Sequence, residues 1–187
     1  EDERAGTRKA PFSKVLWIER DGVRQDPPPK DHRLAPGREV RLRGAYYVTC
    51  TGFDTDAAGE VSVVRCSYDP ATKGGWSQDG RKIKGTIHWV SAAHAVEAEV
   101  RLYDFLFGIE NPGAEKDFKA HINPDSLEVL AGCKLEPELA RAKPGERFQF
   151  ERLGYFAADS RDCRPGALVF NRTATLRDTW AKIEKKG

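Results

Sequence analysis

Short runs of alternating apolar and polar residues, separated by turn-forming residues, constrain the fold of this chain more than any other feature. In residues 39–48, apolar residues such as Val40 and Leu42 alternate with charged ones, as a half-buried strand requires. Several short strands with frequent turns between them are typical of β-barrels and β-sandwiches. Further runs with strand character occupy residues 61–68, 82–90, 97–107, 148–156 and 168–175.

Signals for helices are weak and short. Residues 114–121 and 136–142 are each long enough for one or two turns, and residues 178–183 for another. The three prolines at 27–29 form a stiff, extended stretch that suits neither a helix interior nor a central strand. The sequence therefore predicts a mainly β fold with few short helices.

The composition is that of a globular protein and not of a disordered one. Of the 187 residues, 39% are hydrophobic and 32% are charged, which leaves enough apolar surface for a core. The formal net charge is only +2. Binding of a nucleic acid would therefore depend on a local basic patch, because the overall electrostatic field is weak.

The sequence also carries expectations about processing and location. Residues 1–14 are charged and polar, and no apolar run approaches the ~20 residues that span a bilayer. We therefore expect no signal peptide, no membrane partner and a cytoplasmic location. The cysteines lack the paired spacing of zinc sites, so we expect reduced thiols, although Cys50 and Cys66 could face each other across a hairpin. Because the sequence contains no Met, we expect a processed product or a piece of a longer protein.

Candidate catalytic and metal-binding residues are few. His88 and His94 are six positions apart and do not share one helical face, which favours packing or hydrogen bonding over metal binding. No Ser lies in a nucleophile elbow, and Gly74 and Gly75 do not form a phosphate-binding loop. The residues alone therefore predict no catalytic residue, no metal site and no cofactor in this chain.

A pair of arginines is the strongest candidate for binding. On a single strand, Arg41 and Arg43 would project from the same face, with Tyr47 further along it. Guanidinium groups donate to base edges and phosphates, and aromatic rings stack on unpaired bases, so this set suits single-stranded RNA. The alternative is a solvated polar face on which Glu39 pairs with the arginines, and spacing alone favours this alternative.

Longer stretches resemble, in order and over residues 8 to 183, the C-terminal half of the bacterial-type glutaminyl-tRNA synthetase family. These stretches are long, so the resemblance is more specific than a short motif would be. They are PFS at 11–13, WI at 17–18, EVRLR at 39–43, GTIHWVSAAHA at 85–95, VRLYD at 100–104, FQFER at 148–152, GYF at 154–156, VFNRT at 169–173 and LRDTWAK at 176–182.

The resemblance implies the function of the longer protein. Members of this family are class I ligases that use ATP, with Mg, to attach glutamine to its tRNA in protein biosynthesis. Their ATP-binding catalytic domain carries His-Ile-Gly-His-like and Lys-Met-Ser-Lys-Ser-like signatures, and neither occurs in this chain. The resemblance thus implies an anticodon-binding region without the catalytic domain. Its partners would be the anticodon of tRNA(Gln) and the protein's own N-terminal catalytic domain, and the protein would be a monomer.

The resemblance also implies a fold and its domain boundaries. The family's C-terminal half consists of two β-barrels, similar to the barrel of a ribosomal protein that binds 5S rRNA. By this resemblance, residues 10–87 together with 166–187 form the proximal anticodon-binding barrel. Residues 88–165 form the distal barrel, inserted between them.

The same resemblance assigns roles in anticodon binding to residues of the proximal barrel. Arg33 matches the family's arginine for the third anticodon base, and Lys30 and His32 match its neighbours. At those two positions the family often has Gln and Lys, so this chain departs from the pattern there. Arg41 and Arg43 match two arginines of the pocket for the first base.

For the middle base, the matching residues are Gln149 and Arg152. A further arginine of that pocket lies upstream of this sequence in the family, so we expect the middle-base pocket to be incomplete here. On a regular strand, Gln149 and Arg152 would point to opposite faces. Both reach one base only if the strand bends or bulges near Leu153 and Gly154.

Two rival interpretations remain open at this point. The first is a glutamyl-tRNA synthetase of the archaeal and eukaryotic type, which shares the barrels; the stretch around Trp89 and the last residues argue against it. The second is a free-standing barrel that binds ribosomal RNA or serves as a scaffold, which the lack of Met argues against. Anticodon preference separates the first rival from the main interpretation, and the length of the encoded protein separates the second.

Overall fold

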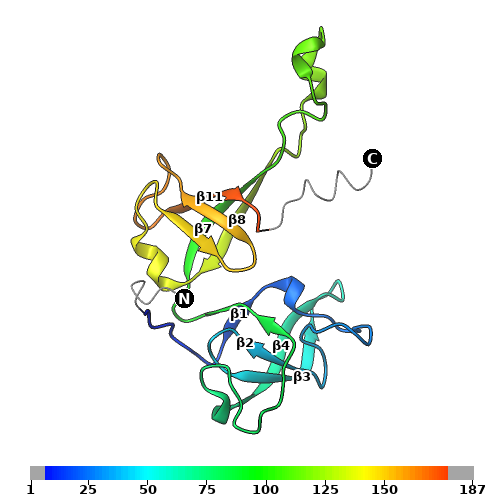
Figure 1. Cartoon of the computed structure of the whole chain (residues 1–187), viewed down its shortest axis with the longest axis vertical. Coiled ribbons are helices and arrows are strands. Elements are labelled where there is room, and N and C mark those ends of the chain that lie inside the picture. Colours follow the sequence, from blue (N-terminus) through cyan, green and yellow to red (C-terminus); the bar gives the residue numbers. More distant parts are fainter. Residues whose placement is uncertain (1–6, 177–187) are drawn as a thin grey trace. The chain divides into compact units, whose positions relative to one another are not determined.

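The computed structural model describes residues 7–176, and the chain divides into two compact units. We call Glu1–His94 unit 1 and Ala95–Gly187 unit 2 (Figure 1). Both are built from β-strands with short 3-10 helices, and the described residues contain no α-helix. The predicted mainly β fold is confirmed, although the strand pairings within residues 7–176 do not close any of the three sheets into a barrel.

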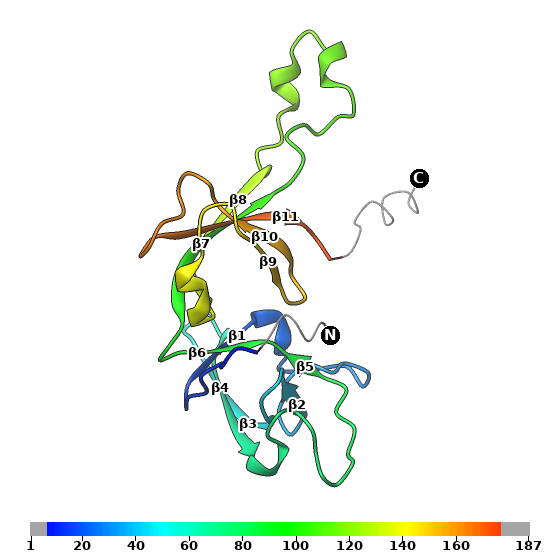
Figure 2. The ribbon, with the colours of Figure 1, turned by 60° about the vertical axis from the view of Figure 1, so that its left-hand side comes forward.

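Unit 1 contains a four-stranded sheet in the order β4-β3-β2-β5 and a two-stranded sheet in which β1 pairs with β6 (Figure 2). Neighbouring strands are antiparallel except β2 and β5, which are parallel. The elements are β1 (Leu16–Ile18), η2 (Arg20–Gly22), β2 (Glu39–Leu42), β3 (Tyr47–Thr55), β4 (Val61–Asp69), η3 (Pro70–Thr72), β5 (Thr86–Ile87) and β6 (Trp89–Ser91).

Unit 2 contains one five-stranded sheet in the order β8-β7-β11-β10-β9. β7 and β11 are parallel, and the other neighbours are antiparallel. The segment between β7 and β8 extends beyond this sheet and carries η4 and η5 (Figure 2). The elements are β7 (Val96–Tyr103), η4 (Pro112–Ala114), η5 (Phe118–His121), β8 (Leu127–Leu135), η6 (Pro137–Arg141), β9 (Arg147–Phe150), β10 (Gly154–Ala158) and β11 (Leu168–Ala174).

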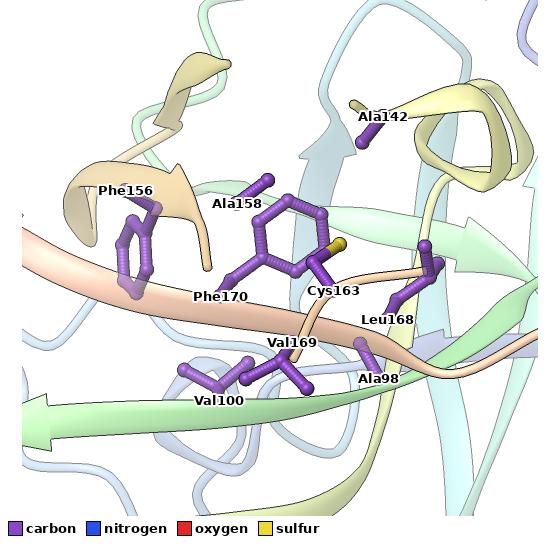
Figure 3. Packing of buried hydrophobic residues seen from close by; sticks show 9 residues of the cluster. All are labelled: Ala98, Val100, Ala142, Phe156, Ala158, Cys163, Leu168, Val169 and Phe170. Carbon is purple, nitrogen blue, oxygen red and sulfur yellow. The ribbon is translucent and has the colours of Figure 1, made fainter. Parts of the chain in front are cut away.

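Each unit has its own hydrophobic core. In unit 1 the inward-facing residues of β2, Val40 and Leu42, lie in a cluster with Leu34 and Trp89. In unit 2 the central side chain is Phe170 of β11, which is 0% exposed (Figure 3). Its ring lies edge-on to that of Phe148, with the ring centroids 5.8 Å apart. Each sheet therefore buries one face against its own unit.

Two predicted single strands are instead hairpins. Residues 39–48 form β2, a turn and the start of β3, and residues 148–156 form β9, a turn and β10. In the first hairpin Val40 pairs with Val48, and in the second Phe148 pairs with Phe156. In each hairpin the paired residues are an even number of positions apart. The alternation of apolar and polar residues therefore continues unbroken across the turn, and the sequence has the pattern of one long strand.

The predicted domain boundaries are wrong at two places. Residues 168–174 form β11, which pairs with β7 and β10 in unit 2, whereas we expected this segment in the proximal barrel. Trp89–Ser91 forms β6, which pairs with β1 in unit 1, whereas we expected it in the distal barrel. Both corrections involve pairings between strands far apart in sequence, which local alternation does not reveal. Residues 177–187 lie outside the described residues.

Other predicted elements differ in extent. The returning strand at 61–68 is confirmed as β4, and the run at 97–107 corresponds to β7. No sequence pattern predicted β8, whose pairing with β7 is interrupted by a register shift and whose residues are mostly exposed. The predicted helical segments at 114–121 and 136–142 contain only 3-10 turns, and the one at 178–183 lies outside the described residues.

Three further observations bear on function. Within residues 7–176, no helix is long and apolar enough to cross a membrane. The same residues contain no group of three or more His, Cys, Asp or Glu side chains suited to a metal ion. All four cysteines are free thiols. Cys50 and Cys66 lie opposite each other on β3 and β4, which is the arrangement across a hairpin that the sequence allowed.

Candidate nucleic-acid interface

Three of the predicted site residues lie on one exposed loop of unit 1. Lys30, His32 and Arg33 all have exposed side chains and follow directly on the three prolines at 27–29. The next residue, Leu34, is 1% exposed and belongs to the core of unit 1. The loop is therefore anchored at its C-terminal end, while the side chains of Lys30, His32 and Arg33 face solvent.

An arginine holds the backbone of this loop. The Arg38 guanidinium donates to three carbonyl oxygens, those of Pro27, Pro28 and Asp31. The backbone N–H of Asp31 also donates to the Pro28 carbonyl, at 3.0 Å. With several carbonyls tied to one rigid guanidinium, the loop has a defined conformation before any ligand binds.

Asp31 orients Arg33. The Asp31 carboxylate accepts hydrogen bonds from the backbone N–H of Arg33 at 2.8 Å and from its Nε at 3.2 Å. The backbone hydrogen bond from Arg33, followed by the charge of its guanidinium, lowers the pKa of Asp31 below the ordinary value. In the described part of the chain, Nη1 and Nη2 of Arg33 make no hydrogen bond. The outer edge of this guanidinium is thus available to an acceptor.

A glycine brings the loop against the sheet. A Cβ on Gly85 would lie 2.1 Å from the carbonyl oxygen of His32 and 3.0 Å from Cγ1 of Val40, so no other residue fits there. The Gly85 carbonyl accepts a hydrogen bond from the backbone N–H of Arg41 at 2.9 Å. Gly85 therefore joins the loop that carries Arg33 to the strand that carries Arg41.

Arg41 lies between two aromatic rings. Its Cζ is 5.8 Å from the ring centroid of Tyr47 and 5.5 Å from that of Trp76, within the range of cation–π contacts. Nη2 donates to the Ile83 carbonyl at 3.3 Å, which is a long bond. Its Nε is buried and has no hydrogen-bond partner among the described residues. This guanidinium is held mainly by rings and keeps unused donors.

The structure changes the expected roles of the aromatic residues. Tyr47 pairs with Arg41 across the β2–β3 hairpin, so the two share a face as predicted. The ring of Tyr47 is only 2% exposed, however, and the expected stacking platform for a base is covered. Trp76, which no strand or motif pattern identified, is 75% exposed. A Trp within a Gly- and Asp-rich loop was the signal that could have identified it.

Arg43 lies in the turn just beyond β2 and is exposed. Its backbone N–H donates to the Ile87 carbonyl at 3.0 Å, and its carbonyl accepts from Nε1 of Trp89 at 2.9 Å. The following residue, Gly44, has φ +66°, which lets the chain turn back into β3. The backbone position of Arg43 is therefore fixed by two strands and a core tryptophan.

In unit 2, Gln149 and Arg152 lie on the β9–β10 hairpin. Gln149 is exposed on β9, the edge strand of the sheet, and pairs with the exposed Tyr155. Arg152 is exposed within the turn, where it has φ +66°, and Leu153 N–H donates to the Phe150 carbonyl at 3.0 Å. Because Arg152 belongs to a turn and not to a strand, the alternation of strand faces does not separate it from Gln149.

Two other arginines, one in each unit, have carboxylate partners for every guanidinium nitrogen. Arg81 contacts Glu39, Asp69 and Asp79 at distances of 2.5–3.0 Å, so the expected pairing of Glu39 with the strand arginines is wrong. These side-chain hydrogen bonds, led by those that Arg81 donates to Glu39, raise the pKa of Arg81. Arg101 in unit 2 likewise contacts three carboxylates, those of Glu99, Asp159 and Asp162. Such saturated arginines stabilise the fold and have little capacity left for a ligand.

His94 belongs to a hydrogen-bond network with two serines. Nδ1 of His94 lies 2.8 Å from Oγ of Ser91, which in turn lies 2.7 Å from Oγ of Ser13. This network joins the end of β6 to the segment before β1. The interpretation of His94 as a hydrogen-bonding residue is therefore confirmed.

Two family models match the chain. One match lies within unit 1, and the other lies mostly in unit 2. Both carry the description "tRNA synthetases class I (E and Q), anti-codon binding domain", and they match residues 1–69 and 86–159. Arg33, Arg41 and Arg43 lie within the first match, and Gln149 and Arg152 within the second.

The chain is also similar to curated glutamine–tRNA ligases over its whole length. It is 52% identical to that of Nitrobacter winogradskyi and 55% identical to that of Nitrobacter hamburgensis over 187 residues, 100% of this chain and 33% of each relative. It is 52% identical to that of Vibrio parahaemolyticus over 181 residues, 97% of this chain and 32% of the relative. The chain thus spans about a third of the length of these relatives.

Proposed function

This chain belongs to the anticodon-binding domains of the class I tRNA synthetases of the E and Q type, and we propose that it binds the anticodon of tRNA(Gln) for a glutamine–tRNA ligase. In this proposal the chain holds the anticodon, and residues outside it carry the reaction. The ligase would attach glutamine to the tRNA with ATP and Mg in a separate catalytic domain. It would do so as a monomer in the cytoplasm.

The observation that carries the proposal is the arrangement of Arg33. Its Nε is held by Asp31, and the loop around it is held by Arg38, while Nη1 and Nη2 have no partner in the described part of the chain. A guanine offers O6 and N7 as adjacent acceptors, which one guanidinium edge engages with two hydrogen bonds. Glutamine anticodons end in G, so we assign Arg33 to the third base, with Lys30 and His32 beside it.

The other candidates are assigned to the remaining bases. Arg41 and Arg43 lie on and just after β2 in unit 1, and we assign them to the first anticodon base. Gln149 and Arg152 lie on one exposed hairpin of unit 2, and we assign them to the middle base. A glutamine amide and a guanidinium both hydrogen-bond the Watson–Crick edge of an unstacked base.

The proposal is tested by binding of the 187-residue chain to anticodon stem–loop RNAs. One RNA carries a glutamine anticodon, and a second differs only in having C in place of the third-position G, which makes it a glutamate anticodon. We expect the first to bind more tightly by roughly 5- to 150-fold, the equivalent of about 1–3 kcal/mol for one well-placed bidentate arginine. We also expect affinity to fall as salt rises, because contacts to phosphates release counterions.

The same measurement separates the rival functions. A glutamyl-tRNA synthetase would prefer the second RNA, which would contradict the proposal. A barrel that binds ribosomal RNA or serves as a scaffold would bind both RNAs equally or neither, which would also contradict it. Equal affinity at low and high salt would show that the basic loop of unit 1 does not contact phosphates.

A further inference from the structure

The side chain of Trp76 is far more exposed to solvent than is usual for tryptophan. At 75% exposure it is the most exposed of the large apolar side chains in the described part of the chain. Tryptophan is on average among the most buried residue types, because its ring removes a large apolar area from water. A single exposed apolar side chain is common on folded surfaces, so the inference depends on the group that lies beside this indole.

The loop that carries Trp76 is firmly held, so its exposure does not come from a loose segment. The buried Thr72 accepts a hydrogen bond from the backbone N–H of Tyr47 at 2.8 Å, and its own carbonyl accepts from Gly75 N–H at 2.9 Å. On the other side of Trp76, Arg81 is bound to carboxylates on β2 and β4 and within the loop itself. The ring therefore projects from a segment fixed at both ends.

Arg41 adds hydrogen-bonding capacity beside the ring. Its Cζ lies 5.5 Å from the indole centroid. Of the five N–H groups of a guanidinium, one, on Nη2, is used, and the buried Nε has no partner among the described residues. Gly75 keeps this packing tight, since a Cβ there would lie 3.1 Å from Cδ of Arg41. A planar apolar face and a planar donor group thus lie side by side.

This pairing matches the chemistry of one unpaired nucleobase. A base has a π face that stacks on indole and carbonyl or ring-nitrogen acceptors at its edge that a guanidinium engages. A carboxylate of a protein partner would satisfy Arg41 but would leave the indole uncovered. An aliphatic side chain would cover the indole but would leave the donors without acceptors.

We propose that Trp76 and Arg41 form a stacking site for a single unpaired RNA base, with Trp76 as the platform and Arg41 as the donor to the base edge. The inference rests on the proposed function, under which Arg41 faces the first anticodon base. It adds Trp76 as a residue that binds this base, in place of the covered ring of Tyr47. Because stacking tolerates every base, Trp76 contributes affinity at this position and little discrimination.

The test is a double cycle between Trp76→Ala and removal of the first anticodon base. The 187-residue chain and its variant are each titrated with the glutamine anticodon stem–loop and with the same RNA made abasic at the first anticodon position. We expect Trp76→Ala to weaken binding to the intact loop by roughly 5- to 150-fold, which is the scale for stacking of one base on an aromatic side chain. On the abasic loop we expect less than about a twofold loss, because the stacking partner is absent.

Two further variants act as controls. Trp76→Phe keeps a smaller platform and should retain part of the affinity. Trp17→Ala removes another indole of unit 1, on β1 and 50% exposed, and should change both RNAs equally or not at all. Thermal unfolding of Trp76→Ala should match that of the unchanged chain, since an exposed ring contributes little to the core.

The outcomes distinguish this inference from the proposed function. An equal loss on the intact and abasic loops, or no loss on either, overturns the stacking site while the chain still prefers the glutamine anticodon. If Trp76→Ala weakens binding to a carboxylate-rich peptide and leaves RNA binding unchanged, the site belongs to a protein partner, and the proposed stacking site is also overturned. If the unchanged chain shows no preference for the glutamine loop, the proposed function fails, and the stacking site fails with it.

Discussion

The two units present their candidate RNA-binding side chains in different ways. In unit 1, neighbouring side chains hold them: Asp31 binds Nε of Arg33, and two aromatic rings flank Arg41. In unit 2, the backbone places them: Gln149 lies on an exposed edge strand, and Arg152 lies in a turn with φ +66°. Unit 1 thus fixes the direction of a guanidinium through neighbouring side chains, whereas the backbone of unit 2 fixes where these side chains leave the chain.

The difference has consequences for binding. Side chains held by neighbours lose little rotamer freedom when they bind, so unit 1 should contribute more of the discrimination between bases. In unit 2 the exposed Gln149 side chain makes no hydrogen bond among the described residues, so the RNA itself must order it. Gln149 should therefore contribute a contact whose cost of ordering lowers the net affinity that it adds.

Both units nevertheless rely on a glycine that has no room for a side chain. In unit 1 a Cβ on Gly85 would lie 2.1 Å from the His32 carbonyl oxygen. In unit 2 a Cβ on Gly154 would lie 2.3 Å from the Ala174 carbonyl oxygen. Each glycine lets the segment that carries candidate residues pack directly against backbone.

The largest expected effect tests whether the units have independent cores. Phe170→Ala removes a fully buried ring from unit 2 and should lower its free energy of unfolding by about 3–5 kcal/mol. Hydrogen exchange should show loss of amide protection in the strands of unit 2 and unchanged protection in those of unit 1. Phe118→Ala, at a ring that is 46% exposed in the same unit, should cost less than about 1 kcal/mol. Equal loss of protection in both units would show that they fold as one body.

A smaller effect is expected from Gly85→Ala, which tests whether packing of the loop orients Arg33. The new Cβ must push the His32 carbonyl away, so we expect a loss of about 1–3 kcal/mol in stability and a reduced preference for G at the third anticodon position. Thermal unfolding and RNA titration measure the two effects. Gly52→Ala, on β3 with open space around the site, should be close to neutral in both. An unchanged base preference in Gly85→Ala would mean that the loop does not orient Arg33.

The smallest effect is expected at the β9–β10 turn of unit 2, where one substitution should raise stability and weaken RNA binding. A non-glycine residue at positive φ lowers stability by roughly 1–2 kcal/mol, so glycine should remove this strain. Glycine also has greater conformational freedom in the unfolded chain, which lowers the stability gained by about 0.5–1 kcal/mol. Arg152→Gly should therefore stabilise the chain by about 0.5–1 kcal/mol in denaturant titrations while it weakens RNA binding. Arg147→Gly, on the regular strand β9, should destabilise it instead. A destabilised Arg152→Gly would show that contacts of the arginine side chain outweigh the backbone strain.

Local alternation predicted strands of this fold, and it missed their ends where turns preserve the pattern. The run that became β7 was found because apolar and polar residues alternate along it, and the run that became β4 because it returns after the turn-forming residues 54–59. The turn at Gly44 gave no signal, because the alternation continues in phase across that hairpin. The bend that shared binding of one base required near Leu153 and Gly154 is a complete turn at Arg152, which alternation likewise did not reveal. The place of β11 was missed because its parallel pairing with β7 joins segments far apart in sequence.

The candidate site followed from the resemblance more than from local pattern. Spacing put Arg41 and Tyr47 on one face, which the hairpin confirms, but it could not show that packing against two arginines covers the Tyr47 ring. It also could not distinguish Arg81, which carboxylates saturate, from Arg33, which keeps an open edge. Those distinctions depend on contacts between distant residues.

The assignment of Arg33 to the third anticodon base is tested most directly by a double cycle. The unchanged chain and Arg33→Ala are each titrated with stem–loops that carry G or A at that position. We expect the two changes to couple by roughly 1–3 kcal/mol, because the variant has lost the group that distinguishes the bases. Arg24→Ala serves as the matched control, since Arg24 also pairs with Asp31 and its side chain is 45% exposed against 44% for Arg33. Coupling for Arg33 with additivity for Arg24 is the predicted result, and additivity for Arg33 would contradict its role in reading the base.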